Sequence, residues 1–145
     1  MGNGAHPALT WTDRNAVTGE YARKVLAYGD CLARIAQRAK EPGFGQSGWD
    51  ELAAMLDTEK FRRVGNDMGV MDWDVYRNML TMWAAASDFR LEFHRISEAG
   101  SNVYMELTEY NYPRGGSETE VNACTAYQFD EAGKLVQLRV YLQYP

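Results

Sequence analysis

The sequence contains little cysteine, little proline and no long apolar run. Its two cysteines, Cys31 and Cys124, lie far apart in segments of apolar pattern, so we expect two buried free thiols and no disulfide. No apolar run approaches the roughly 18 residues that a membrane helix needs. A chain of 145 residues can bury one ordinary core, and we therefore expect one soluble domain, residues 1–145, that does not enter a membrane.

Basic residues are also scarce. The 15 Lys and Arg stand against 20 Asp and Glu, which gives a net charge of −5, so we expect no nucleic-acid partner. The opening MGNGAHPALTW lacks the charged and apolar regions of a signal peptide. This favours a cytoplasmic protein with residues 1–12 as a loose tail.

Motifs for cofactors and metals are missing as well. The sequence has no Gly-rich phosphate loop, no nucleophile elbow and no dinucleotide fingerprint. Its two histidines, His6 and His94, show no ligand spacing. We therefore expect neither a cofactor nor a metal site.

Helical periodicity dominates the first 87 residues. Residues 12–40 predict a long amphipathic helix, with Thr12 or Asp13 as its N-cap. Its apolar stripe consists of Val17, Tyr21, Val25, Tyr28, Leu32, Ile35 and Ala39.

Two further helices are predicted. Residues 47–56 form a short one, in which Ser47 and Asp50 resemble a capping box. The stretch from Phe61 to Val64 is compatible with a short strand, and Asp72 then caps a helix over residues 73–87. The buried stripe of that helix consists of Val75, Tyr76, Met79, Leu80 and Trp83.

From residue 88 onward the period changes to 2, which predicts an antiparallel meander of four strands on short turns. Helices followed by strands indicate an α+β architecture with the helices on one face of a curved sheet. The other face carries Tyr104, Tyr110, Tyr112 and Tyr141. We expect a homodimer contact there, the alternative being an exposed face rich in aromatic residues.

The last two strands, TEVNACTAYQFDEAGKLVQLRVYL, together with the order of elements, resemble the nuclear transport factor 2-like superfamily. This group includes ketosteroid isomerases, scytalone dehydratases, limonene epoxide hydrolases and SnoaL-like polyketide cyclases. The resemblance implies a cone-shaped antiparallel sheet of about four to six strands, wrapped around three N-terminal helices and enclosing an apolar chamber. The chamber residues that it implies are Val121, Ala123, Thr125, Tyr127, Leu138, Val140 and Leu142, to which we add Trp83.

The resemblance also suggests residues for acid–base chemistry on a carbonyl compound. Thr125 falls where ketosteroid isomerases have an oxyanion donor, and Tyr28 lies near their helix-borne tyrosine donor. Alternatively, Thr125 is an ordinary strand residue and Tyr28 a core tyrosine. Asp67 follows the short strand where the family's base sits, although an alignment with fewer gaps places Val64 there, and Asn-Asp before Gly also suits a turn.

Two further candidates come from strand parity. Alternation carries the apolar face of Val103, Met105 and Leu107 onto Glu109, which is either an acid or base of the chamber or a hydrated rim residue. His94 lies on the polar side of its strand, as an exposed or interface histidine, unless a bulge reverses the parity and points it inward.

We reject epoxide hydrolase chemistry, because Met105, Leu107 and Val140 stand near the places of its Asp-Arg-Asp arrangement. Gln143 replaces the acid that ends the last strand of many SnoaL-like proteins, which weakens a cyclase assignment. The expectation is a cofactor-independent isomerase, dehydratase or cyclase acting on a small hydrophobic carbonyl compound of steroid or polyketide type. The alternative is a non-catalytic module that binds a hydrophobic ligand or forms a dimeric interaction surface.

Overall fold

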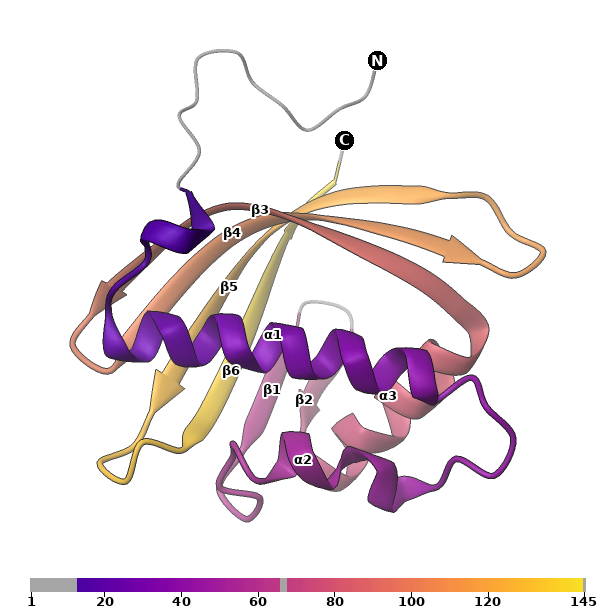
Figure 1. Cartoon of the computed structure of the whole chain (residues 1–145), viewed down its shortest axis with the longest axis horizontal. Helices are drawn as coiled ribbons and strands as arrows, with labels where there is room; N and C mark the ends of the chain where they lie inside the picture. The colour runs from indigo at the N-terminus through magenta and orange to yellow at the C-terminus, as the bar shows by residue number, and fades with distance from the viewer. Residues whose placement is uncertain (1–12, 66–67, 145) are drawn as a thin grey trace.

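A computed structural model describes residues 13–65 and 68–144 (Figure 1). The predicted tail, with His6 and the cap candidate Thr12, lies outside the described residues, and so does the base candidate Asp67.

The long predicted helix is present as α1, Glu20–Arg38, but its predicted start is wrong. Asp13 instead caps a separate 3-10 helix, Arg14–Ala16, by accepting a hydrogen bond from the Asn15 amide. The N-cap of α1 is Gly19, and the free amide of Ala22 donates to Glu98 Oε1 at 2.7 Å. The Glu98 carboxylate, which comes from the sheet, therefore caps α1 in place of the neighbouring side chain predicted from the sequence.

The second helix is shorter than predicted. A 3-10 turn, Gln46–Trp49, leads into α2, Asp50–Ala53, and no side chain caps α2, so the Ser47 capping box does not form. Trp49 holds this segment in place, because its ring is fully buried and its Nε1 donates to Thr81 Oγ1 at 2.9 Å. Tertiary packing thus overrides the capping pattern.

The third helix, α3, spans Trp73–Ala86 and begins as predicted, with Asp72 accepting a hydrogen bond from the Val75 amide at 2.9 Å. Its buried face is rotated from the predicted stripe, because Trp73 and Ala84 are buried while Val75 is half exposed. The predicted Met79 and Trp83 are only partly buried. This rotation turns Tyr76 and Leu80 toward α1 and the sheet.

Six strands form one curved sheet in the order β2-β1-β6-β5-β4-β3. Their bounds are β1 Arg62–Gly65, β2 Gly69–Met71, β3 Ser87–Ala99, β4 Asn102–Pro113, β5 Thr119–Phe129 and β6 Leu135–Gln143. The predicted meander β3 to β6 is antiparallel, whereas β1 joins β6 in parallel, so the sheet is mixed. In Figure 1 the sheet arches over α1, with α2 and α3 beneath that helix. The α+β fold expected from the sequence is confirmed.

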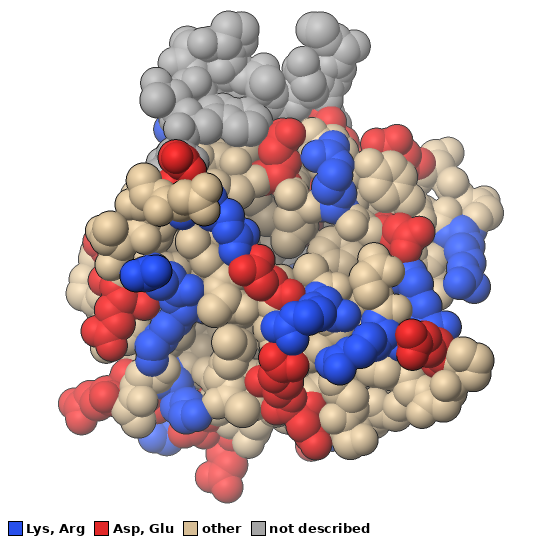
Figure 2. All heavy atoms as spheres, in the orientation of Figure 1, with Lys and Arg blue, Asp and Glu red and all other residues tan. Residues whose placement is uncertain are grey.

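The outside of the molecule mixes charges of both signs. Figure 2 shows Lys and Arg interspersed with Asp and Glu over the face that carries α1. Ion pairs such as that of Arg34 with Glu51, 2.9 Å apart, are exposed and contribute little to stability. No helix among the described residues is long and apolar enough to span a membrane.

Candidate functional site

A cavity of about 250 Å³ lies between α1, α3 and the inner face of the sheet. Tyr28, Trp83, Thr125, Tyr127, Leu138, Val140 and Leu142, all predicted as site residues, line it. Val121 and Ala123 share the inner face of β5 but do not line this cavity. The Ala123 side chain is short and packs between its strand neighbours Leu107 and Leu142, which cover it.

Glu109 is the one described carboxylate in the lining of this cavity. It follows Leu107 on the inner face of β4, as alternation predicts, and it faces Val121 across the ladder. Burial raises the pKa of the Glu109 carboxyl above its usual value, and the positive charge of Arg63 opposes that rise. Glu109 makes no hydrogen bond or ion pair with another described residue. Its carboxyl is therefore available to a bound molecule.

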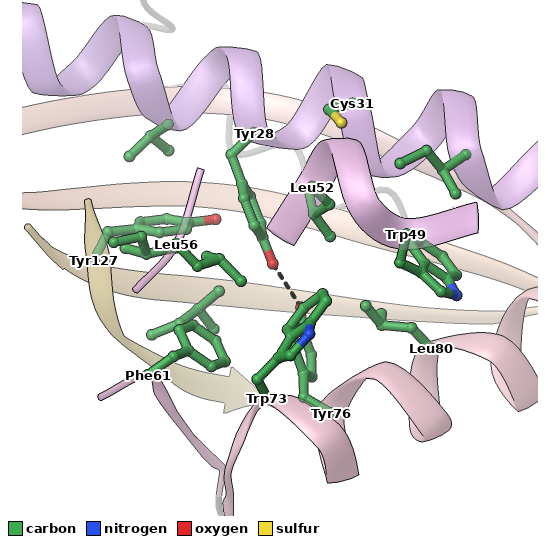
Figure 3. Close-up of a cluster of buried hydrophobic side chains, with 14 of the residues drawn as sticks. Tyr28, Cys31, Trp49, Leu52, Leu56, Phe61, Trp73, Tyr76, Leu80 and Tyr127 are labelled. Carbon is green, nitrogen blue, oxygen red and sulfur yellow. Dashed lines mark hydrogen bonds between the residues drawn. The ribbon is translucent and has the colours of Figure 1, made fainter. Parts of the chain in front are cut away.

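Two tyrosines from different helices meet beside the cavity. The hydroxyl oxygens of Tyr28 on α1 and Tyr76 on α3 are 2.8 Å apart, and Figure 3 shows the two side chains pointing toward each other. Burial raises the pKa of both phenols, so both stay protonated. One hydroxyl donates to the other, and the accepting hydroxyl keeps a proton that it can donate to a ligand oxygen.

Tyr127 extends this group of phenols. Its ring packs edge-on against Tyr28, with centroids 6.0 Å apart, and burial raises the pKa of its hydroxyl as well. The Tyr127 and Thr125 hydroxyls make no hydrogen bond with another described residue. Together with the Tyr28–Tyr76 pair, they supply neutral donors in a mainly apolar chamber.

Arg63 is a cavity residue that sequence reasoning missed. It lies on β1 opposite Leu138 of β6 and lines the same cavity as Glu109. The sequence offered only a weak signal: in the predicted strand from Phe61 to Val64, alternation places residue 63 on the same side as the apolar Phe61. Tyr76 was assigned to the core, and its partnership with Tyr28 required knowledge of how α1 crosses α3.

The predicted wall residue Trp83 is held in place by a hydrogen bond and by a tilted contact with an aromatic ring. Its Nε1 donates to Asn111 Oδ1 at 3.1 Å, and its ring lies 4.5 Å from that of Phe89, centroid to centroid. Met105, Leu107 and Val140 also line the cavity and make this part of its wall apolar.

His94 does not reach the cavity. A bulge does occur between Phe93 and Arg95, but it leaves His94 and Arg95 both on the outer face and returns Ile96 to the inner face. His94 is buried there, with its Nε2 2.9 Å from Thr108 Oγ1, and is not exposed as parity suggested. Thr108 Oγ1 donates in turn to Asn122 Oδ1 at 2.8 Å. His94 is thus part of a polar cluster behind the sheet.

The cysteines are both free, as predicted, although only Cys31 is buried and Cys124 is half-buried. Strand pairing explains the difference, because Cys124 sits opposite Glu106 and Tyr141 on the outer face. Among the described residues no group of three His, Cys, Asp or Glu could hold a metal ion.

Comparison with known proteins finds similar solved structures but no match by sequence to a family model or a curated protein. A candidate SnoaL-like polyketide cyclase from Shewanella putrefaciens superposes with a TM-score of 0.69 at 11% identity, over 88% of this chain and 93% of that one. This chain has the nuclear transport factor 2-like fold.

Two other solved structures share that fold. A nuclear transport factor 2-like protein of unknown function from Cytophaga hutchinsonii matches with a TM-score of 0.62 at 17% identity, over 88% of this chain and 94% of that one. An epoxide hydrolase of the limonene type from Mycobacterium tuberculosis matches with a TM-score of 0.62 at 15% identity, over 84% of both chains. The nuclear transport factor 2-like fold hosts different chemistries, so the function of a chain with this fold depends on the residues of its cavity.

Proposed function

We propose that the chain is a cofactor-independent enzyme of the isomerase, dehydratase or cyclase kind, which moves protons on a small hydrophobic carbonyl compound. The observation that carries the proposal is Glu109, a carboxyl of raised pKa that has no hydrogen-bond or ion-pair partner among the described residues. It lies in a cavity lined mainly by apolar groups and neutral donors. A general base works best when its pKa lies near the working pH, because it is then ionised and still binds a proton well. A raised pKa brings the Glu109 carboxyl closer to that condition at neutral pH.

In the proposed reaction each of these groups has one role. Ionised Glu109 removes a proton from the carbon next to the carbonyl, and the carbonyl oxygen takes up negative charge. The Tyr28–Tyr76 pair, with Thr125, donates hydrogen bonds to that oxygen. Protonated Glu109 then returns the proton to the same carbon or another one, or to a leaving hydroxyl. Isomerisation and dehydration share this first step.

The first step can be measured without knowing the natural substrate. 1-Tetralone is a compact apolar ketone, and exchange of its C2 protons with deuterium in D₂O reports enolisation by proton NMR. The wild type is expected to accelerate this exchange, and Glu109→Gln is expected to lose at least about 100-fold of the catalysed rate. Glu106→Gln, on the outer face, is the matched control and should keep the rate. Unchanged exchange in Glu109→Gln would refute the assignment of Glu109 as the base.

A binding role is the second candidate, because most of the cavity wall is apolar and Thr125 replaces the acid of ketosteroid isomerases. In that case 1-tetralone binds without exchanging its protons. The free thiols of Cys31 and Cys124 suit a reducing, cytoplasmic setting for either role.

We further propose a homodimer joined through the outer face of the sheet. Three of the predicted tyrosines, Tyr104, Tyr112 and Tyr141, are 38–51% exposed there, whereas Tyr110 is buried under Arg90. Large aromatic side chains on an exposed sheet face favour association. Sedimentation equilibrium should give twice the monomer mass of 16.4 kDa, and a monomer would refute this.

A further inference from the structure

Arg63 occupies an uncommon position for an arginine. It points to the inner face of β1 and lines the cavity, and its Nη1 is buried with no hydrogen-bond partner among the described residues. Its neighbour Arg62 is exposed and donates from Nη1 to the carbonyls of Phe61 at 2.7 Å and Glu59 at 3.2 Å. The two adjacent arginines thus differ: Arg62 is hydrogen-bonded to backbone carbonyls, and no described residue accepts a hydrogen bond from Nη1 of Arg63.

Gly65 leaves space for the Arg63 guanidinium. A Cβ atom at residue 65 would overlap Arg63 Nη1, so Gly65 is what allows the group to lie close to the backbone. The obstacle would be the far end of a flexible side chain, so a methyl group at residue 65 should displace the guanidinium and leave the sheet intact.

No described carboxylate forms an ion pair with Arg63. Glu109 is the one described carboxylate in the lining, and no ion pair joins it to Arg63. The Arg63 guanidinium therefore has a buried donor, Nη1, that no described residue satisfies, in surroundings that are mainly apolar. An unpaired cation in such a place costs free energy, which a bound anion recovers.

We propose that the cavity binds a compact apolar molecule that carries a carboxylate, with the Arg63 guanidinium pairing with that carboxylate and Glu109 facing the carbon skeleton. The planar fork of a guanidinium matches the two oxygens of a carboxylate, and one cation suffices for its single charge. This inference rests on the proposed function and narrows its substrate class to hydrophobic keto acids or related unsaturated acids.

The test compares two probes of the same shape. 2-Naphthoate carries a carboxylate, and 2-naphthamide replaces it with a neutral amide. Isothermal titration calorimetry of the wild type is expected to show at least about 10-fold tighter binding of 2-naphthoate. Arg63→Met should remove this preference and leave the affinity for 2-naphthamide within about 3-fold. Arg62→Met, the outward neighbour, should keep the preference.

Gly65→Ala tests the same pairing independently, because it should move the Arg63 guanidinium without removing its charge. This variant should weaken 2-naphthoate binding several-fold. If Arg63→Met does not fold, Gly65→Ala shows whether Arg63 binds the carboxylate. The proposal is overturned if the wild type binds the two probes equally well or binds neither. It is also overturned if the preference persists in both Arg63→Met and Gly65→Ala.

Failure of this inference can be told apart from failure of the proposed function. Glu109→Gln should lose deuterium exchange on 1-tetralone and keep the preference for 2-naphthoate, because the two readouts depend on different side chains. A wild type that exchanges 1-tetralone but shows no preference refutes only the carboxylate assignment. A wild type that prefers 2-naphthoate but catalyses no exchange refutes only the enzymatic role.

Discussion

The two faces of the sheet accommodate charge in different ways. On the outer face, Arg95 Nε lies 2.8 Å from Glu106 Oε2, and the Arg90 guanidinium lies 3.9 Å from the centre of the Tyr110 ring. On the inner face, Glu109 and Arg63 have no such partners among the described residues. The charged groups named on the outer face thus have an ionic or aromatic partner, whereas Glu109 and Arg63 have none among the described residues. Unpaired charges in apolar surroundings cost stability, and such costs concentrate at functional sites.

The largest effect expected from this comparison concerns the phenols. Tyr76→Phe removes one hydroxyl of the Tyr28–Tyr76 pair, and deuterium exchange on 1-tetralone should fall by roughly 10²-fold, as for other lost oxyanion donors. Tyr110→Phe removes a hydroxyl of the outer face, which bonds Glu92 at 3.3 Å, and should leave exchange unchanged. Equal losses in the two variants would show that the difference between the faces has no catalytic meaning.

A smaller effect concerns the dependence of stability on pH. The folded state raises the pKa of Glu109, so below the usual glutamate pKa the carboxyl is neutral in both states and carries no penalty. As pH rises toward the folded-state pKa, the unfolded chain releases its proton first, and the free energy of unfolding falls. Each unit of raised pKa corresponds to about 1.4 kcal/mol.

Glu109→Gln removes this penalty. Urea unfolding should therefore show the variant to be more stable than the wild type at pH 8, and the two should converge near pH 4. Glu106→Gln, which loses an exposed carboxylate paired with Arg95, should not gain stability at pH 8. A stability difference for Glu109→Gln that is the same at both pH values would contradict the burial of this carboxyl.

The smallest effect concerns the helix that faces the inner side of the sheet. Gly29 lies inside α1 and lines the cavity, and a Cβ there would meet nothing within 4 Å. Gly29→Ala should raise the free energy of unfolding by up to about 1 kcal/mol, because glycine is a poor helix former. Gly43→Ala is the contrasting variant. It should lower the free energy of unfolding, because Gly43 has a φ of 84° and alanine adopts such a conformation only with strain. Thermal unfolding measures both.

Periodicity predicted α1, α3 and the meander, because the inner face of each strand and one face of each helix are buried. It could not predict the cap of α1 by Glu98, since that contact joins residues 76 positions apart. Glu109 followed from simple alternation. Arg63 was missed because a short strand gives only a weak alternation pattern. The Tyr28–Tyr76 pair was missed because the two tyrosines come from different helices, which meet only through tertiary packing.

The most direct test of the account is the pKa of Glu109 itself. A ¹³C NMR titration of the glutamate side-chain carboxyls, with the Glu109 resonance assigned by its absence in Glu109→Gln, measures this value in the folded protein. We expect a midpoint above the ~4.3 of an ordinary glutamate. We also expect a further rise in the midpoint for Arg63→Met, because that variant loses the opposing positive charge. A midpoint at or below the ordinary value would contradict the assignment of Glu109 as a buried acid–base group.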